Sequence, residues 1–517
     1  MKIIITVFLL FILNAQSLFA QVGYSPRIDS ISNLVTLQAL SILNRELSGD
    51  TATIIGGAPY TILSRNSNSP HNPKAAQFIL ERFQSYGLTA RYMDYRTNGT
   101  NIIATKTGSK YPNQIYIICG HYDNMPSGTL APGADDNASG TCAVMEAARL
   151  LAPFSFEYTL IFVAFDEEEL GLIGSHAYAD SSYNRGDSIK GVLNFDMITW
   201  DGNNDYKLNI YSNSASVNFT NTAKFCFNVY QPVLDPVISV GNMSGSDHYY
   251  FWQRGYNAFC GIELNGDFNP YYHTVNDNFS HVNMPYFLKF TKAALASLMT
   301  FGWDYMIDFI HTPIVTSGES TPRIANVVIN SRYKLKKLVN GPRLYYRVNG
   351  GAFNSLNYDY NNLDTFRFTI PGQSQGSIVD YYFAAQDSLA NFVGTLPLGG
   401  KGLNPPGTIA PPNFLQYTVL TGIASNNEPA EFRLNQNYPN PFNPMTNIQF
   451  TLGKPSHLKI VVNDILGREV AELADISFSA GTHNSVFDGR NYPSGIYYYS
   501  MFIDGALFET KKMILVK

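Results

Sequence analysis

Acids and histidines follow apolar runs in the first half of this chain, and residues of these types can hold a metal ion. The apolar run 160–165 is long enough for a strand buried on both faces, and four acids follow it directly: Asp166, Glu167, Glu168 and Glu169. Carboxylates gathered at the end of a buried strand need a neutralising charge, which a metal ion supplies. A solvated acidic helix start is the alternative interpretation of this run by itself.

Two further stretches add candidate ligands. His121 and Asp123 come directly after the apolar run 114–119, which predicts a second buried strand. Asp135 and Asp136 are adjacent in a glycine-rich turn before a helix of small residues. One such acid would serve as a helix N-cap, whereas a pair on a tight loop suits a carboxylate that bridges two ions.

Asp196 and His273 extend the set. Asp196 follows the short apolar run 191–195, where an aspartate that merely starts a turn is the alternative. His273 lies in a loop shortly before Asp277, and an ordinary loop histidine is the alternative there. An acid at this spacing can hold the imidazole, as carboxylates behind metal ligands commonly do.

Taken together, these stretches place two histidines and several acids at the ends of strands in one α/β region. The carboxyl ends of the strands in such a sheet are where ligands bind. Nitrogen and oxygen ligands of this kind suit zinc. Five ligands with one shared carboxylate are enough for two metal ions roughly 3.5–4 Å apart.

The joint pattern resembles the motifs of secreted di-zinc aminopeptidases of the bacterial leucyl aminopeptidase type, in peptidase family M28. The resemblance covers about residues 28–309, and the motifs occur in the order of the family. They are His121-Tyr-Asp123, Gly133-Ala-Asp135-Asp136-Asn-Ala-Ser-Gly140, Glu168-Glu169-Leu-Gly-Leu-Ile-Gly-Ser175, Phe195-Asp196-Met197 and His273-Thr-Val-Asn-Asp277.

The resemblance implies a role for each candidate. Asp135 is expected to bridge two Zn²⁺ ions, with His121 and Asp196 completing one site and Glu169 and His273 the other. The resemblance also implies that Glu168 is the general base, and that Asp123 and Asp277 support the ligands from behind. The peptide bond between Asp135 and Asp136 is typically cis in this family.

Two other groups near these motifs are given lesser roles. Asp166 and Glu167 have no counterpart in the family pattern and are interpreted as structural. The segment 244–252 also resembles a family motif near the active site, and it implies supporting roles, not metal ligation, for Ser246, Asp247 and His248. The aromatic residues nearby are candidates for the pocket lining or for the core: Tyr249, Phe251, Tyr271 and Tyr272.

The elements that must position these residues alternate between helix and strand. Amphipathic or small-residue patterns predict helices over 26–48, 74–86, 137–151 and 284–309. Strands are predicted over 89–95, 101–105, 114–119, 160–165, 191–195 and 257–262. This alternation predicts an α/β three-layer sandwich around a mostly parallel mixed sheet, which the resemblance identifies as the zinc exopeptidase fold.

The second half of the chain is different in character, because helical patterns vanish after about residue 312. Strand-like runs separated by Gly, Asn and Pro predict two β-sandwich domains there. The expected domains are a peptidase domain over 21–311, an immunoglobulin- or fibronectin-like sandwich over 312–422 and a third domain over 431–517. The last resembles the C-terminal sorting domain of type nine secretion, through 434–444, 464–467, 494–497 and 511–517.

The N-terminus predicts export. Residues 1–20 have a cationic start, a short apolar core and a small residue at the expected cleavage site, Ala20. No later run is long and apolar enough to span a membrane, so the mature chain is expected to be secreted or displayed at the cell surface. Its four cysteines contain no C-x-x-C pair, and buried free thiols are expected, with a Cys226–Cys260 bridge as the alternative.

Composition excludes one class of partner. The net charge of −5 and only 15% charged residues leave no basic excess to attract nucleic acid. The partners expected from the resemblance are peptides with a free N-terminus and the outer-membrane secretion machinery.

Three functions remain open at this point. The leading one is a secreted zinc exopeptidase that removes N-terminal residues, although a carboxypeptidase would share the same metal ligands. A glutaminyl cyclase-like acyltransferase on the same fold typically uses one zinc, and the joint presence of His121 and Asp196 argues against it. A non-catalytic surface-binding protein would be expected to have lost ligands or Glu168, and none is lost.

Overall fold

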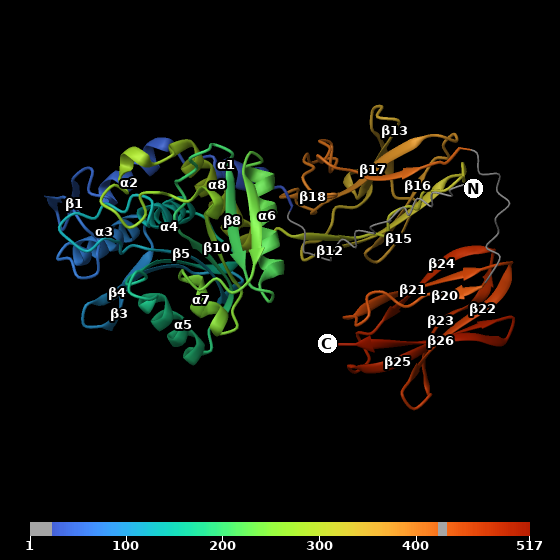
Figure 1. Cartoon of the computed structure of the whole chain (residues 1–517). Helices are drawn as coiled ribbons and strands as arrows, with labels where there is room; N and C mark the ends of the chain where they lie inside the picture. Colours follow the sequence, from blue (N-terminus) through green and yellow to red (C-terminus); the bar gives the residue numbers. More distant parts are fainter. Residues whose placement is uncertain (1–22, 422–431, 517) are drawn as a thin grey trace, which may run out of the picture. The chain divides into compact units, whose positions relative to one another are not determined.

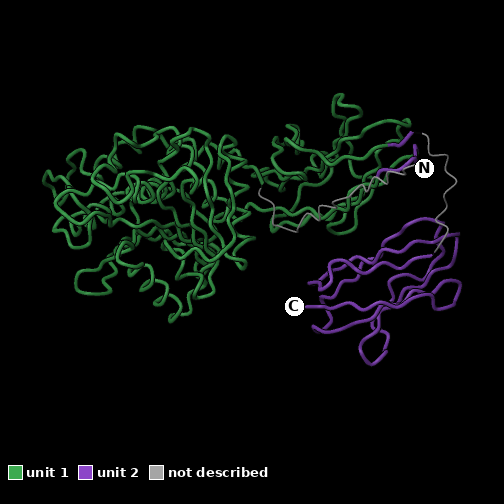
Figure 2. Tube along the Cα trace, in the orientation of Figure 1, with its two compact units in different colours: residues 1–315, 321–418 green, residues 316–320, 419–517 purple. Residues whose placement is uncertain are grey.

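The computed structural model describes residues 23–421 and 432–516, so the expected signal peptide lies outside the described residues (Figure 1). The chain forms two compact units (Figure 2). Unit 1 runs to Val315 and resumes over Thr321–Thr418, and unit 2 holds Thr316–Ser320 and the chain from Val419 onward. The expected peptidase region and the middle β region therefore belong to one unit, and the expected domain boundaries remain predictions.

An eight-stranded mixed sheet organises the first part of unit 1 (Figure 1). In spatial order its strands are β3 (Thr89–Arg96), β4 (Gly99–Lys106), β6 (Tyr158–Phe165), β5 (Tyr111–His121), β7 (Ser188–Phe195), β10 (Ala258–Glu263), β8 (Lys207–Ser212) and β9 (Asp235–Val240). The four central strands, β6, β5, β7 and β10, are parallel to one another. Every residue of β6 is buried, because the strand is covered on both faces.

Helices cover both faces of this sheet, which confirms the three-layer arrangement. One face carries α1 (Pro26–Ser32), α2 (Leu37–Leu47), α3 (Asn72–Ser85), α4 (Ala138–Leu151), α6 (Val217–Tyr230) and α8 (Met284–Trp303), through contacts among themselves and with the strands. The other face carries α5 (Ile173–Arg185) and α7 (His248–Gln253). Between this second layer and the sheet lies a core that includes Val163, Phe165, Tyr178 and Phe251.

Short elements complete this region of the chain. They are the hairpin strands β1 (Thr53–Ile55) and β2 (Ala58–Tyr60), and the 3-10 turns η1 (Asn265–Asp267) and η2 (Phe279–His281).

The predicted N-terminal helix is two helices, so the expectation of one helix over 26–48 is wrong. Asn33 caps the first helix, and Thr36 begins the second by accepting the N–H of Ala39 at 3.2 Å. The break rotates the buried face, so Leu40 and Leu43 are buried whereas Ile42 is 48% exposed. The helices α5 and α6 and the strands β8 and β9 had no strong periodic signal.

The last predicted helix is also shorter than expected. It ends at Trp303, and Asp304 adopts a left-handed conformation with φ 58° as its C-cap. The following segment, β11 (Ile307–Ile310), pairs with the strand Arg323–Ser331 of the middle region instead of continuing the helix. The middle sheets therefore begin before residue 311, where the peptidase region was expected to end.

The middle region has two antiparallel sheets, as the strand pattern predicts. One contains β11, β12 (Arg323–Ser331), β16 (Thr365–Ile370) and β15 (Tyr360–Asn362), in that spatial order. The other contains β14 (Asn354–Asn357), β13 (Arg343–Val348), β17 (Ile378–Gln386), β18 (Val393–Leu396) and β19 (Leu415–Thr418). A 3-10 turn, η3 (Leu338–Asn340), precedes β13. Tyr24, near the start of the described chain, exchanges backbone hydrogen bonds with Val393, which ties the two parts of unit 1 together.

Unit 2 has two antiparallel sheets of its own, as expected for the C-terminal domain. They are β20 (Arg433–Leu434), β21 (Met445–Leu452) and β24 (Gly481–Asp488), and β23 (Glu469–Phe478), β22 (Ser456–Asp464), β25 (Gly495–Ile503) and β26 (Ala506–Leu515). Alternating residues point inward to a core that includes Phe450, Ile460, Tyr499 and Met513.

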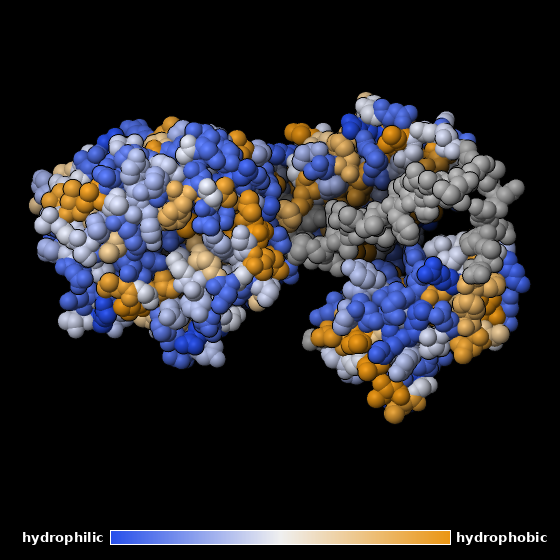
Figure 3. All heavy atoms as spheres, viewed as in Figure 1, coloured by the Kyte–Doolittle hydropathy of each residue, from blue (hydrophilic) through white to orange (hydrophobic). Residues whose placement is uncertain are grey.

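The remaining expectations on the whole chain concern cysteines and membranes. All four cysteines are buried free thiols, so the Cys226–Cys260 bridge does not form. Among the described residues, no helix has the length and hydropathy needed to cross a bilayer. On the face drawn in Figure 3, apolar patches are scattered among hydrophilic residues in both units.

Candidate metal centre

The candidate ligands meet at the carboxyl edge of the central parallel strands. His121 is the last residue of β5, Asp196 follows the end of β7, and Glu168 and Glu169 follow β6 after a short turn. Because β5, β6 and β7 are parallel neighbours, their carboxyl ends lie at the same edge of the sheet. The predicted gathering of these residues is therefore present.

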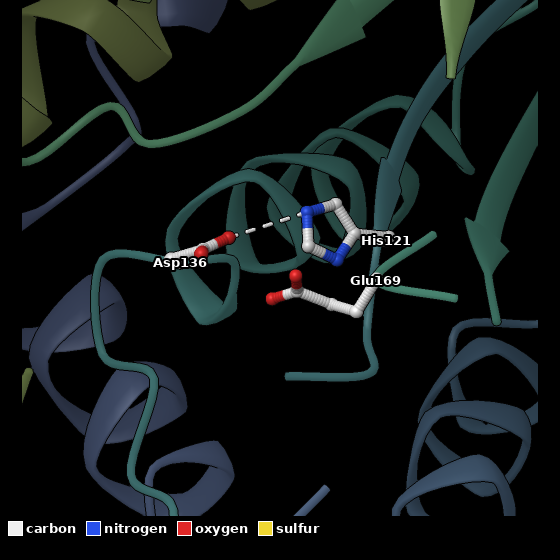
Figure 4. A group of neighbouring side chains, drawn as sticks. All are labelled: His121, Asp136 and Glu169. Carbon is white, nitrogen blue, oxygen red and sulfur yellow. Dashed lines mark ion pairs between the residues drawn. The ribbon is translucent and has the colours of Figure 1, made fainter. Parts of the chain in front are cut away.

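Two groups of side chains are close enough to share an ion. One contains His121, Asp136 and Glu169, and the other contains His121, Glu168 and Asp196. Within each group the candidate ligand atoms all lie within 4.8 Å of one another. Figure 4 shows His121, Asp136 and Glu169 converging from three segments on one space, with Asp136 in the turn before α4.

The carboxylate of Asp136 lies between two histidines. Its Oδ1 is 3.4 Å from Nε2 of His121, and its Oδ2 is 3.2 Å from Nε2 of His273. Nε2 of His121 is also 3.3 Å from Oδ1 of Asp196, and Nε2 of His273 is 2.8 Å from Oε2 of Glu169. One carboxylate thus faces two sets of ligand atoms, with one oxygen toward each.

The structure places Asp136, not Asp135, in this bridging position, which corrects the expectation for Asp135. Oδ1 of Asp135 accepts hydrogen bonds from the N–H and hydroxyl of Thr199, at 2.9 and 2.7 Å. Its Oδ2 accepts one from Nδ2 of Asn269 at 2.9 Å. Because adjacent side chains on the turn point in different directions, only one of the two acids can face the histidines. The cis peptide bond also lies one residue later than expected, between Asp136 and Asn137.

Asp277 holds the loop of Asp136 and not the imidazole of His273, which corrects a second expectation. Its Oδ1 accepts the N–H of Asp135 at 3.0 Å, and its Oδ2 accepts the N–H of Asp136 at 2.9 Å. The side chain is 1% exposed, so these bonds are shielded from water. The supporting role is present, but it acts on the backbone next to the ligand.

Asp123 lies behind the centre and contacts both sides of it. Its Oδ1 is 3.4 Å from Nδ1 of His121, and it also accepts the N–H of Glu168 at 3.1 Å. Its Oδ2 accepts the N–H of Glu169 at 3.2 Å and the hydroxyl of Ser67 at 3.2 Å. Nδ1 of His121 also contacts the backbone carbonyl oxygen of Asp123 at 3.1 Å. Asp123 therefore orients the histidine, and its carboxylate fixes the backbone of the acid pair, as expected of a residue behind metal ligands.

The protonation of the centre reflects crowding of acids in a buried space. Burial raises the pKa of Glu168 well above its ordinary value, His121 opposes this shift, and Asp196 adds to it. Burial and the charge of Asp136 raise the pKa of Glu169 to about 8. Burial lowers the pKa of His121, but the carboxylates around it outweigh this effect and leave the pKa well above its usual range.

Several buried atoms of the centre fit a cation. Oε1 of Glu169 has no hydrogen-bond partner among the described residues, and Oδ2 of Asp136 and Nε2 of His273 have no contacts there beyond the ion pairs of His273 with Asp136 and Glu169. Buried polar atoms are normally paired, so unpaired atoms that face one space indicate an additional ligand. Carboxylate oxygens and imidazole nitrogens are the donors that zinc takes in proteins.

The other two acids after β6 point away from the centre. Glu167 forms an ion pair with Arg96 and accepts the hydroxyl of Tyr95 at 2.9 Å. Asp166 accepts Nδ2 of Asn72 at 3.0 Å. Both acids are buried and paired with protein groups, in keeping with the structural interpretation.

The motif around residue 247 lies against the centre without adding a ligand. The hydroxyl of Ser246 donates to Oδ2 of Asp196 at 2.7 Å and therefore orients that acid. Nε2 of His248 contacts the carbonyl oxygen of Met243 at 3.1 Å, and burial lowers the pKa of the imidazole to about 3. Burial raises the pKa of Asp247 to about 7, and the charge of His121 opposes that shift.

Of the nearby aromatic residues, Tyr272 is the one that borders the centre. Its ring stacks on that of His273 at 3.6 Å, and 40% of the residue is exposed. Phe251 belongs to the core behind α7. Arg65, Thr199 and Asn269 support the centre but were missed, because single polar residues in loops carry no periodic or motif signal.

Comparison with known families agrees with this geometry. Residues 101–298 match the model of peptidase family M28, and this segment contains all the ligand candidates. This part of the chain is therefore similar to peptidase family M28. Residues 436–517 match a secretion system C-terminal sorting domain, which corresponds to unit 2 and indicates an exported or surface-displayed protein.

Named relatives of the M28 domain include metalloproteases. A probable zinc metalloprotease of Pyrenophora teres f. teres is 41% identical over 104 residues, covering 19% of this chain and 22% of that protein. Aminopeptidase YwaD of Bacillus subtilis is 29% identical over 197 residues, covering 36% of this chain and 42% of that protein. The chain thus spans less than half of the length of either relative. LapB of Legionella pneumophila, a solved structure, is 20% identical with a TM-score of 0.49, covering 55% of this chain and 76% of that one.

Proposed function

We propose that this protein is an exported zinc-dependent exopeptidase, and specifically an aminopeptidase that holds two Zn²⁺ ions. The observation that carries the proposal is the placement of Asp136, whose two carboxylate oxygens face His121 and His273 separately. A carboxylate placed in this way suits two ions bridged by one residue.

The contacts among these side chains support the proposed ligand set. Asp136 is shared, His121 and Asp196 complete one position, and Glu169 and His273 complete the other. This set is the one expected from the resemblance, with Asp136 in place of Asp135. When bound, zinc supplies a Lewis acid that polarises a carbonyl group and lowers the pKa of water.

Glu168 is proposed as the general base. It is buried beside the ligands, its Oε2 lies 4.0 Å from Nε2 of His121, and burial raises its pKa above the ordinary value, which favours uptake of a proton from water. Glu168 would take a proton from the attacking water while the oxygen–carbon bond forms. It would then deliver that proton to the leaving amine as the carbon–nitrogen bond breaks.

A preference for a free N-terminus is the finer part of the proposal. The aminopeptidase among the relatives supports this choice. Export across the outer membrane, by machinery that recognises unit 2, is proposed from the sorting-domain match.

Metal analysis of the purified full chain, paired with peptide assays, tests the proposal. We expect two zinc ions per chain and release of the N-terminal residue from a peptide with a free amine, with loss of activity in chelator and recovery on adding zinc. An N-acetylated copy of the same peptide is the matched control. Equal cleavage of the two peptides would contradict the aminopeptidase assignment, and a zinc content near zero would contradict the metal assignment.

A further inference from the structure

Arg65 is a buried cation whose side-chain hydrogen bonds all go to backbone carbonyl groups. It lies in the segment between β2 and α3 and is fully buried. Its Nε donates to the carbonyl of Tyr122 at 2.7 Å, Nη1 to those of Leu47 and Pro132, and Nη2 to that of Gly133 at 2.7 Å. One side chain therefore joins the end of α2, the end of β5 and the turn that leads to Asp136.

This arrangement differs from an ordinary buried ion pair. Within the described residues, the guanidinium group of Arg65 forms no salt bridge. Burial lowers its pKa to about 10, and the charge of Asp277 opposes that shift, so the group remains cationic at neutral pH. A buried charge is costly unless its donors are satisfied, and here four of the five N–H donors bond to carbonyl oxygens. A buried guanidinium group of this kind is expected where it holds backbone segments in a geometry that the protein requires.

The segment that Arg65 contacts is the Asp136 loop, which we define as residues 131–137. Asn124 donates from Nδ2 to the carbonyl of Ala131 at 2.6 Å, and Asn44 donates to that of Ala134 at 2.6 Å. Asp277 accepts the N–H groups of residues 135 and 136. Donors thus hold the carbonyl groups in the first half of the loop, and an acceptor holds the amides in its second half.

The two charged residues impose direction on the loop. Arg65 attracts the carbonyl oxygens of residues 132 and 133, whereas Asp277 attracts the N–H groups of residues 135 and 136. Carbonyl and amide groups of successive peptide units are therefore drawn to opposite charges. That orientation determines which of the two adjacent acids faces His121.

We infer that Arg65 is a positioning residue for the metal centre, which holds the Asp136 loop and the end of β5 in the register that directs Asp136 toward His121 and His273. The inference rests on the proposed zinc site but not on peptidase activity. The same guanidinium group also donates to the carbonyl oxygen of Tyr122, the residue after His121. It therefore contacts both the end of β5 and the Asp136 loop. Loss of the guanidinium group should therefore displace the ligand side chains without removing any of them.

Zinc affinity of the folded full chain tests the inference. Arg65→Met keeps the length and apolar volume of the side chain but removes its donors, and Arg65→Lys keeps the charge but not the planar fork. Each variant is titrated with zinc against a competing chromogenic chelator, under conditions in which circular dichroism shows it folded. Hydrogen exchange of the amides of the Asp136 loop is measured in the metal-free protein.

Arg82→Met is the matched control. Arg82, in α3, donates to Glu46 at 2.9 and 3.0 Å and contacts none of the ligands, so its loss removes a partly exposed ion pair elsewhere in unit 1. We expect Arg65→Met to bind zinc about 10- to 100-fold more weakly and to exchange the loop amides faster, whereas Arg82→Met is unchanged in both measurements. Arg65→Lys should bind zinc less tightly than wild type, because an ammonium group cannot span the four carbonyls.

The outcomes separate this inference from the proposed function. If Arg65→Met does not fold, Arg65→Lys decides, and wild-type zinc affinity with wild-type loop exchange in that variant overturns the positioning role. Equal losses in the Arg65 and Arg82 variants would likewise indicate a general effect on stability and contradict it. If wild type binds zinc but does not release N-terminal residues, the aminopeptidase proposal fails while the Arg65 result still stands.

Discussion

Oδ1 of Asp136 lies 3.4 Å from Nε2 of His121, although the two residues come from different elements of the fold. His121 ends β5, and Asp136 stands in the turn before α4. An acid and an imidazole that meet in a buried space lined by acids provide two of the ligands that a metal ion needs. The other oxygen of the same carboxylate faces His273, so Asp136 has a role that its neighbour Asp135 does not share.

Substitution of Asp136 and substitution of Asp135 should therefore have unequal effects. We expect Asp136→Asn to lower zinc content below two ions per chain and to reduce kcat/KM by at least about 10³-fold, because a shared ligand is lost. Asp135→Asn is the matched control and should keep both ions, since that side chain bonds only to protein groups. Metal analysis and kinetics on the two variants check this, and a greater zinc loss in Asp135→Asn would refute the assignment.

Substitution of Glu168 should separate chemistry from metal binding. We expect Glu168→Gln to keep its zinc and to lose about 10²- to 10⁴-fold in kcat, because the amide cannot accept a proton. Glu167→Gln is the neighbouring control. It should lower the melting temperature by loosening the contact with Arg96 but leave kcat near wild type. A Glu168→Gln variant with both ions and full kcat would exclude this residue as the base.

A side chain at Gly133 should disturb the Asp136 loop. Gly133 has φ +49°, and an added Cβ would lie 2.3 Å from the carbonyl oxygen of Asp136. We expect Gly133→Ala to destabilise the protein by about 1–3 kcal/mol and to weaken zinc binding. Gly245→Ala is the control, because its added Cβ would meet its nearest atom at 3.8 Å. Denaturant unfolding and zinc titration measure both effects, and equal results for the two variants would argue against a constrained loop.

The middle region should contribute a pH dependence through His311. Nδ1 of His311 contacts the carbonyl oxygen of Asn326 at 2.6 Å and must carry the proton there, so Nε2 accepts the hydroxyl of Tyr381 at 2.9 Å. Burial lowers the pKa of His311 from 6.5 to about 4. Between pH 6.5 and 4 the unfolded chain therefore binds more protons, and the free energy of unfolding falls as pH falls, by at most about 1.4 kcal/mol per pH unit.

Unfolding of wild type and His311→Gln at several pH values between 7 and 4 checks this contribution. The difference in stability between the two proteins should be constant above pH 6.5 and should shift in favour of the variant as the pH approaches 4. Parallel curves for wild type and His311→Gln would show that the imidazole does not titrate differently on folding.

The residues that directly follow a predicted strand were the part of the centre that could be predicted. The apolar runs that became β5, β6 and β7 indicated buried parallel strands, and such strands bring His121, Asp196 and the acids after β6 to one edge. Helix ends were less predictable, because the break at residues 33–36 and the stop at Asp304 depend on local capping and on the strand that follows. The contacts of Arg65 and Asp277 join segments far apart in the chain and leave no local pattern.

The residue types, their order, the α/β alternation and the shift to β structure in the second half could all be read from the sequence. Which of the two adjacent acids serves the centre depended on tertiary contacts, because neighbouring side chains on a turn diverge and their directions depend on backbone angles. Here buried partners distant in sequence hold those angles: Arg65 bonds to the carbonyl groups and Asp277 to the amides. Asp136 therefore faces the histidines, and Asp135 faces Thr199 and Asn269.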